Sequence, residues 1–269
     1  MTSLNNTNIR VSRPHLTEIL SGSLNRTAPP GRATNESGSK STGSITLAMH
    51  QSQYLPWAPY FKKMMQTDVF VIMDNVQFQK NGLQNRNKIA GKSGPQWITV
   101  PVKSGLRATI ADKIIADQSW RKKHLKSIQA CYGRAPNFDK YFAEIKRIID
   151  QEYTHLHQVN KNFIDYFREV LEIRNRLVTL SDLDIHSHKS NLILDTCRTL
   201  GATTYISGIG GTNYLDLEAF DNANIRVEFL ESNPPNYSCR CSSDSGLSML
   251  DYLMYEDVAV VRAYLTNQT

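Results

Sequence analysis

Cysteines, long apolar runs and secretory features are all scarce in this sequence. Only four cysteines occur among 269 residues, which is too few for a disulfide framework and favours a reducing compartment. No window approaches about 18 consecutive apolar residues, so we expect no membrane-spanning helix. The first residues also lack the compact apolar stretch of a secretory signal. Together these absences predict a cytoplasmic protein.

The charge balance excludes little by itself. Apolar residues make up 40% of the chain and charged residues 21%, as in a globular protein, and the formal net charge is +6. Such a mild excess suits an anionic small ligand as well as a nucleic acid. No helix-turn-helix or RNA-binding motif is visible, so nucleic acid is the less favoured partner. The basic residues between 80 and 126 are interpreted first as a solvated face.

Composition divides the chain into two parts. Residues 1–43 are rich in Ser, Thr, Asn, Gly, Pro and Arg and hold few large apolar side chains. They cannot bury enough surface to offset chain entropy, so we predict a disordered N-terminal extension. Residues 44–269 are expected to form one α/β domain. Inside it, aromatic residues at helical spacing over about 118–175 predict a helical insertion or subdomain.

Short apolar runs predict the sheet. Strands are expected at 45–49 and 69–73, joined by a helix that ends near Met65. Near-continuous apolar strands joined by a helix indicate a parallel sheet that is covered on both faces. Further strands are expected at 97–100, 177–180, 203–206 and 225–230, helices at 192–200, 213–220 and 247–255, and mostly loop at 78–92. The predicted fold class is therefore α/β, with a mostly parallel Rossmann-like sheet.

The loop after the first predicted strand is the first candidate site. It offers His50, Gln51, Gln53 and Tyr54 within five residues, just before a helix. In open α/β sheets ligands bind beyond the carboxyl ends of the strands, and a helix N-terminus favours anions. His50 is a candidate for acid/base work or for stabilising a developing charge. The alternative is a histidine that is satisfied by a hydrogen bond in the core.

A second candidate loop contains Ser207, Gly208, Gly210 and Gly211. Its three glycines let the backbone approach a phosphate closely. The spacing matches neither the dinucleotide-binding fingerprint nor the Walker A loop, so a plain strand-to-helix turn is the alternative. Ser207 as a nucleophile lacks a G-x-S-x-G context.

Three further polar positions complete the candidate set. Asp74 ends the second strand and is suited to hold a metal, a ribose hydroxyl or an amine, or else to cap the next turn. Arg86 and its neighbour Asn87 are candidates to grip a phosphate or carboxylate, with a surface loop as the alternative. His124 lies among lysines and is interpreted as a solvated helix position.

A metal site has weak support in the sequence. Cys239 and Cys241 form a C-x-C pair, and His186 and His188 form an H-x-H pair. Together they offer a Cys₂His₂ donor set, but the spacing matches no established zinc motif. We therefore predict no metal ligand, and the sequence identifies no cofactor.

Several longer segments resemble the WbqC-like family in the family's own order. They are H-Q-S-Q-Y-L-P-W at 50–57, D-V-F-V at 68–71, D-N-V-Q-F at 74–78, Q-N-R-N at 84–87, W-I-T-V-P-V at 97–102, Y-I-S-G-I-G-G-T-N-Y-L-D at 205–216 and L-S-M-L-D at 247–251. The resemblance covers roughly residues 45–255. Two parts depart from it: residues 1–43, and the loop at 232–246, which lacks the aromatic and His-Pro stretch of the family.

The resemblance implies a biological setting. The family is associated with bacterial surface-polysaccharide (O-antigen) gene clusters, which implies a transferase that acts on an activated sugar or acyl donor. A non-catalytic module that binds a nucleotide sugar is the main alternative, and the sequence does not indicate an oligomeric state. The expected partner is a phosphorylated or sugar substrate. The predicted site has His50 and Asp74 as catalytic residues and Gln51, Gln53, Tyr54, Gln77, Arg86, Asn87, Ser207, Gly208, Gly210, Gly211 and Tyr214 as substrate-binding residues.

Overall fold

A computed structural model describes residues 43–105, 107–231, 233–237 and 246–267. From Gly43 onward the chain belongs to one compact unit. Apart from Gly43, the extension predicted for residues 1–43 lies outside the described residues, and so do Cys239 and Cys241. Within the described part, no helix is long and apolar enough to cross a membrane.

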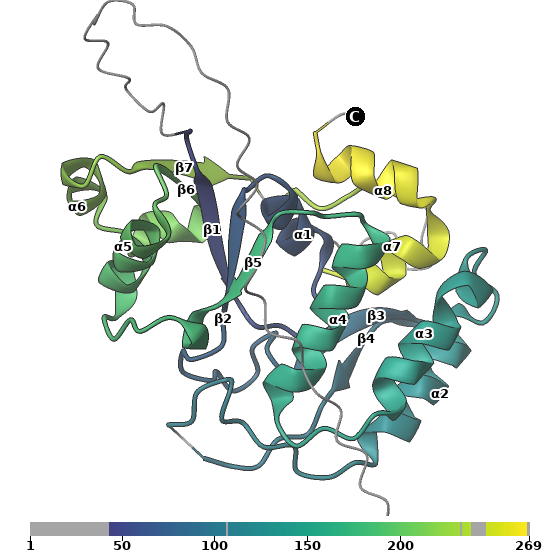
Figure 1. Cartoon of the computed structure of the whole chain (residues 1–269). Helices are drawn as coiled ribbons and strands as arrows, with labels where there is room; N and C mark the ends of the chain where they lie inside the picture. The colour runs from purple at the N-terminus through teal and green to yellow at the C-terminus, as the bar shows by residue number, and fades with distance from the viewer. Residues whose placement is uncertain (1–42, 106, 232, 238–245, 268–269) are drawn as a thin grey trace, which may run out of the picture. The chain divides into compact units, whose positions relative to one another are not determined.

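A five-stranded sheet organises this unit, and all of its strand pairs are parallel (Figure 1). From one edge to the other its strands are β5 (Arg176–Thr179), β2 (Val69–Met73), β1 (Thr46–Gln51), β6 (Thr204–Gly208) and β7 (Arg226–Leu230). This arrangement confirms the predicted α/β class with its mostly parallel, Rossmann-like sheet. β2 matches the predicted run 69–73, because consecutive apolar residues suit a strand that is covered on both faces.

Helices cover both faces of the sheet (Figure 1). The helices of the unit are α1 (Ala58–Met65), α2 (Trp120–Tyr132), α3 (Phe138–Asp150), α4 (Leu156–Val170), α5 (Lys189–Leu200), α6 (Leu217–Asn222), α7 (Met249–Tyr255) and α8 (Val258–Leu265). Of these, α2 and α3 lie away from the sheet (Figure 1). On the face covered by α5 and α6, Leu47 shares a core cluster with Phe220. On the opposite face, Ala48 shares a larger cluster with Phe61 of α1 and Phe163 of α4. Successive residues of β1 thus pack into two separate cores, because side chains along a strand alternate between the two faces of the sheet.

The structure corrects the expectation of mostly loop at 78–92. There, β3 (Arg86–Gly91) pairs antiparallel with β4 (Gly94–Thr99) to form a separate hairpin. Asn87 is fully buried in β3 and donates to the main-chain oxygen of Leu55 at 2.7 Å. This tertiary hydrogen bond compensates for burying a polar side chain at a position where strands usually carry an apolar residue. The strand predicted at 97–100 belongs to this hairpin, outside the main sheet.

The helix predicted over 213–220 is wrong in its first half. A 3-10 turn, η2 (Ile209–Asn213), follows β6, and α6 begins only at Leu217. Asp216 caps α6 by accepting a hydrogen bond from a backbone N–H of its first turn at 3.1 Å. Such a cap stabilises a helix that starts after the aspartate, so the cap decides where this helix begins.

The strand order creates a switch point beside β1. From β1 the chain passes through α1 to β2 on one side, whereas the later strand β6 pairs with β1 on the other side. The connections therefore diverge between the carboxyl ends of β1 and β6. In open α/β sheets this divergence leaves a crevice in which ligands bind.

Candidate functional site

A cavity of about 60 Å³ lies at this switch point. Three of its lining residues stand at or next to the carboxyl ends of strands: His50 of β1, Gly208 of β6 and Leu230 of β7. The others are Trp57 at the N-cap of α1, Pro59 and Tyr60 in its first turn, and Lys63 in its last turn. Residues of β1 and α1 thus give the cavity a polar wall. Its position, at a switch point beyond the carboxyl ends of the strands, is where open α/β sheets bind ligands.

Lys63 brings a buried amine to the cavity. The residue is 8% exposed, and its Nζ donates to the main-chain oxygen of Met49 at 3.0 Å. Among the described residues this is the acceptor that the amine reaches, although an ammonium carries three donors. Burial lowers the pKa of Lys63 from 10.5 to about 8. The amine is therefore mostly cationic at neutral pH, and an anion in the cavity would relieve its desolvation.

His50 stands beside this amine as a neutral imidazole. Burial and then the charge of Lys63 lower its pKa to about 3, against the smaller upward effect of the hydrogen bond to Gln51. Its Nδ1 lies 3.3 Å from the main-chain oxygen of Gln51. A carbonyl oxygen only accepts, so Nδ1 carries the proton and Nε2 keeps a lone pair. The ring also packs at 4.8 Å from the ring of Tyr60.

Tyr60 adds an unsatisfied hydroxyl. The residue is fully buried, and its OH has no hydrogen-bond partner among the described residues. Burial, with a smaller effect of Asp165, raises the pKa of Tyr60 far above its usual range, so the hydroxyl stays protonated. Buried polar groups are normally paired, and an exception in a cavity wall needs an explanation.

A second polar group, the Ser52–His157 network, lies at the ends of β1 and β2. The Ser52 hydroxyl contacts His157 Nδ1 at 2.9 Å and accepts from Asn160 Nδ2 at 3.1 Å. The direction of the Ser52–His157 bond depends on which ring nitrogen of His157 carries the proton. His157 Nε2 lies 4.0 Å from a carboxylate oxygen of Asp74. Burial lowers the pKa of His157, and the Asp74 carboxylate opposes this effect.

Asp74 is anchored rather than open to a ligand. It is 2% exposed, and the backbone N–H and the hydroxyl of Ser181 donate to it at 3.0 and 2.6 Å. Gln51, at the end of β1, is also engaged: its side-chain oxygen accepts from Gln84 at 2.9 Å. Asn160 donates to the main-chain oxygen of the same Gln84 at 2.8 Å. The network therefore ties the ends of β1 and β2 to α4.

Comparison with known proteins identifies the family of this chain. The model of the WbqC-like protein family matches residues 51–263. The chain belongs to the WbqC-like protein family. An uncharacterised protein of Mycobacterium tuberculosis (strain ATCC 25618 / H37Rv) is 31% identical over 188 residues, which cover 69% of this chain and 81% of that protein.

Part of the predicted site comes together in this WbqC-like chain. His50 and Gly208 line the same cavity, and Gln51 and Asp74 belong to the adjoining network. Gln53 is buried next to them in sequence, and its side-chain oxygen has no partner among the described residues. Four predicted positions, His50, Gln51, Asp74 and Gly208, therefore meet at one edge of the sheet, as the parallel strand order requires.

Other predicted residues lie elsewhere. The fully buried Tyr54 hydroxyl forms a hydrogen bond of 2.8 Å with Nδ1 of His124. The side chain of Asn87 donates to the main-chain oxygen of Leu55. The remaining predicted positions away from the cavity are exposed Gln77, Gly210 and Tyr214, half-buried Arg86 on the hairpin, and buried Ser207 and Gly211. A side chain at Gly211 would meet the Ser207 hydroxyl at 2.0 Å, so close packing accounts for this glycine.

His124 is a correction to the sequence analysis. It was expected on a solvated helix face, yet it is 4% exposed and contacts the Thr99 main-chain oxygen at 3.2 Å. Burial lowers its pKa to about 4, with smaller effects from the bond to Thr99 and from Lys123. The lysines around it remain at the surface, because α2 turns His124 inward together with Trp120 and Ile128, one turn before and after it.

The site also has members that the sequence analysis missed. Lys63, His157 and Asn160 carry no motif of their own, and Tyr60 stands out only as part of the Tyr60-Phe61 pair that resembles the family. Lys63 follows Tyr60 by three positions, so both lie on one face of α1. The signal in the sequence that would have indicated a buried amine was a lysine on the apolar face of a short helix.

Acid is expected to destabilise the fold through His50. Its pKa is about 3 in the folded chain, far below the unfolded value of 6.5, so only the unfolded state takes up the proton between these values. Stability is therefore complete above pH 6.5 and is lost as the pH falls toward 3. At pH 4.5 the loss corresponds to about 2–3 kcal/mol. Melting temperatures at pH 7.5 and 4.5 should differ less for His50→Gln than for the wild type.

Exposed His186 provides the matched control for this measurement. Its side chain is 90% exposed, so His186→Gln should keep the acid sensitivity of the wild type. An equal loss of melting temperature in wild type and His50→Gln would contradict the assignment of a neutral His50.

Proposed function

We propose that this WbqC-like protein is a transferase that acts on an activated sugar or a similar small anionic metabolite. Its substrate would bind at the switch-point cavity, with the anionic group against Lys63. The observation that carries the proposal is the buried Lys63 amine beside a neutral His50 at the carboxyl ends of β1 and β6. A buried cation is costly unless it is paired, and an anionic ligand is the partner that fits.

The same arrangement supports a group-transfer role for His50. Its Nε2 lone pair is available to take the proton of an attacking hydroxyl while the leaving phosphate stays with Lys63. Anion binding would offset the Lys63 charge, which is one cause of the low pKa of His50. The imidazole would therefore become a better base once the substrate is bound.

Asp74 has a supporting part in this proposal. Its bonds to Ser181 and its proximity to His157 favour a role in positioning the strand ends, rather than in the transfer itself. For the biological setting, we propose surface-polysaccharide (O-antigen) biosynthesis, in line with the gene clusters in which the family is found.

A ligand screen followed by a turnover assay tests the proposal. We expect one class among nucleotides, nucleotide sugars, acyl-CoA compounds and polyanions, each with and without magnesium, to raise the melting temperature of the full chain. The stabilising compound should then be consumed in the presence of acceptors, and His50→Gln should lower the rate by about 100-fold or more. Binding without turnover would favour a non-catalytic nucleotide-sugar module. Stabilisation by polyanions alone would contradict the metabolite site.

A further inference from the structure

An exposed tryptophan lies beside two cations on the hairpin. Trp97 in β4 is 45% exposed, and its Cα partner across the hairpin is Lys88 of β3. The guanidinium carbon of Arg86 lies 4.3 Å from the centre of the Trp97 ring, and Lys88 Nζ lies 5.4 Å from it. We call these three residues the Trp97 platform. An indole that remains half in water offers stacking area, and flanking cations offer charge.

Arg86 keeps unused hydrogen-bonding capacity on this platform. One terminal nitrogen donates to the main-chain oxygen of Asn81 at 2.5 Å. The other terminal nitrogen, Nη1, donates to no acceptor among the described residues, whereas Nε is also unpartnered but lies buried beyond the reach of a ligand. A guanidinium is a planar fork of donors that matches phosphate oxygens in bidentate fashion. The platform therefore combines a ring surface with an incompletely satisfied phosphate-type donor.

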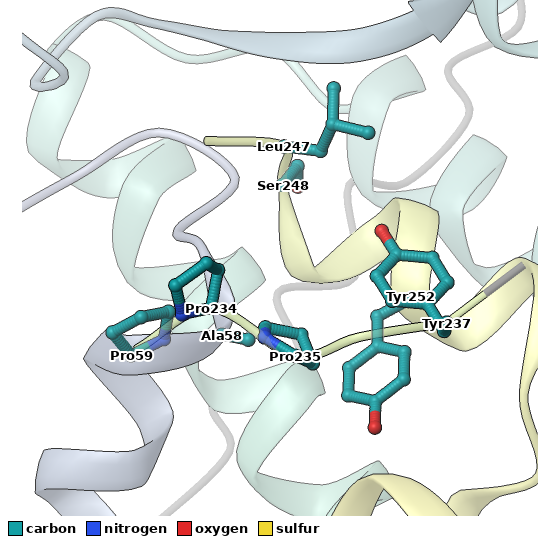
Figure 2. A pocket seen from close by; sticks show the side chains of 8 residues that line it. All are labelled: Ala58, Pro59, Pro234, Pro235, Tyr237, Leu247, Ser248 and Tyr252. Atoms are coloured by element: carbon teal, nitrogen blue, oxygen red, sulfur yellow. The ribbon is translucent and has the colours of Figure 1, made fainter. Parts of the chain in front are cut away.

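The platform is linked to the cavity by a ladder of main-chain contacts. Ser248 donates its N–H to the main-chain oxygen of Lys88 at 3.0 Å and forms an antiparallel bridge with Trp57, a wall of the cavity. Figure 2 shows a second, small pocket near the cavity. Ser248, on the segment that leads into α7, lines this pocket together with Ala58 and Pro59 at the start of α1. Three strand-to-strand steps separate Trp97 from Trp57 along this ladder, and at about 5 Å a step they span about 15 Å.

We propose that the Trp97 platform binds the nucleoside diphosphate part of the activated donor. The base stacks on Trp97, Arg86 and Lys88 contact the phosphate next to the nucleoside, and the phosphate that leaves in the transfer extends toward Lys63 in the cavity. Stacking on an exposed aromatic accepts any base, so the platform contributes affinity without strong base selectivity. This inference rests on the proposed transferase function and names the chemical class of its donor.

Equilibrium titration of the full chain with UDP, ADP and inorganic pyrophosphate tests the inference. We expect both nucleotides to bind about tenfold or more tightly than pyrophosphate and to quench tryptophan fluorescence. Trp97→Ala should reduce UDP and ADP affinity to the pyrophosphate level, whereas Trp97→Phe should retain most of the difference. Unchanged melting temperatures would show that both variants are folded, and a variant that melts early would be replaced by Arg86→Gln.

The controls separate this inference from the proposed function. If pyrophosphate binds through Lys63 but Trp97→Ala binds UDP like the wild type, the platform is only a packing feature and the transferase proposal stands. If none of the three probes binds, both proposals fail. If Trp97→Ala weakens binding of a short oligo-dT with steep salt dependence and leaves UDP unchanged, the platform is a single-strand nucleic-acid site and the inference is overturned.

Discussion

Lys63→Met should strongly weaken anion binding while the protein becomes at least as stable as the wild type. The lysine is 8% exposed and lines the cavity, and burial lowers its pKa from 10.5 to about 8. At pH 7 both folded and unfolded chains carry the proton, so the folded state bears the full desolvation cost of about 3 kcal/mol. Stability recovers only as the pH rises from about 8 toward 10.5, where the folded amine is neutral.

Methionine has a similar length and no charge, so it removes this cost. The lost hydrogen bond to the Met49 oxygen offsets part of the gain, and we expect a net increase of about 1–2 kcal/mol in the free energy of unfolding at pH 7. Loss of a buried charge partner should weaken pyrophosphate binding by about 100-fold or more. Urea denaturation and calorimetric titration measure the two effects separately.

Lys62→Met is the matched control, because it changes the net charge equally on the same helix. Lys62 is half-buried, and its amine lies 4.8 Å from the ring centre of Tyr264, away from the cavity lining. Its pyrophosphate affinity should stay within a few-fold of the wild type. A second readout is proton uptake on binding at pH 8, which we expect in the wild type and not in Lys63→Met. Parallel loss of stability and binding in Lys63→Met would identify a purely structural lysine.

The carboxyl edge of the sheet was predictable because parallel strands collect their ends there. His50 and Gly208 are 158 positions apart, yet each follows an apolar run, and the β1–β6 pairing brings both to the cavity. The run at 69–73 needs no partner to be recognised as a strand, since every residue is apolar. Local pattern and strand polarity together therefore locate the candidate site.

Side chains that depend on distant partners were not predictable in the same way. The sequence alone predicts Asn87 in a loop, because its partner, the main-chain oxygen of Leu55, comes from another segment of the chain. Ser52 and His157 meet across 105 positions, and no periodicity indicates such a pair. Lys63 carries the residue type that most often stays in water, so its burial contradicts the usual rule. Polar residues inside a fold are chosen by tertiary hydrogen bonds, which one sequence does not reveal.

Asn160→Ala is expected to cause the largest loss of stability among polar substitutions near the site. Asn160 is fully buried, and its Nδ2 donates to the Ser52 hydroxyl at 3.1 Å and to the Gln84 main-chain oxygen at 2.8 Å. Alanine leaves two buried acceptors without this donor, at a cost of about 3 kcal/mol. For a chain of this size the melting temperature should fall by about 6–12 °C.

Asn162→Ala on the same helix is the matched control. Asn162 is half-buried and donates to the Tyr153 hydroxyl at 2.9 Å, so its loss exposes partners that water can reach. We expect a cost of about 1 kcal/mol or less in urea denaturation, with the same dependence on denaturant as the wild type. Similar losses for the two variants would mean that Asn160 does not join α4 to the end of β1. A loss confined to Asn160→Ala would show that the hydrogen bonds of this amide fix the carboxyl end of β1, next to His50.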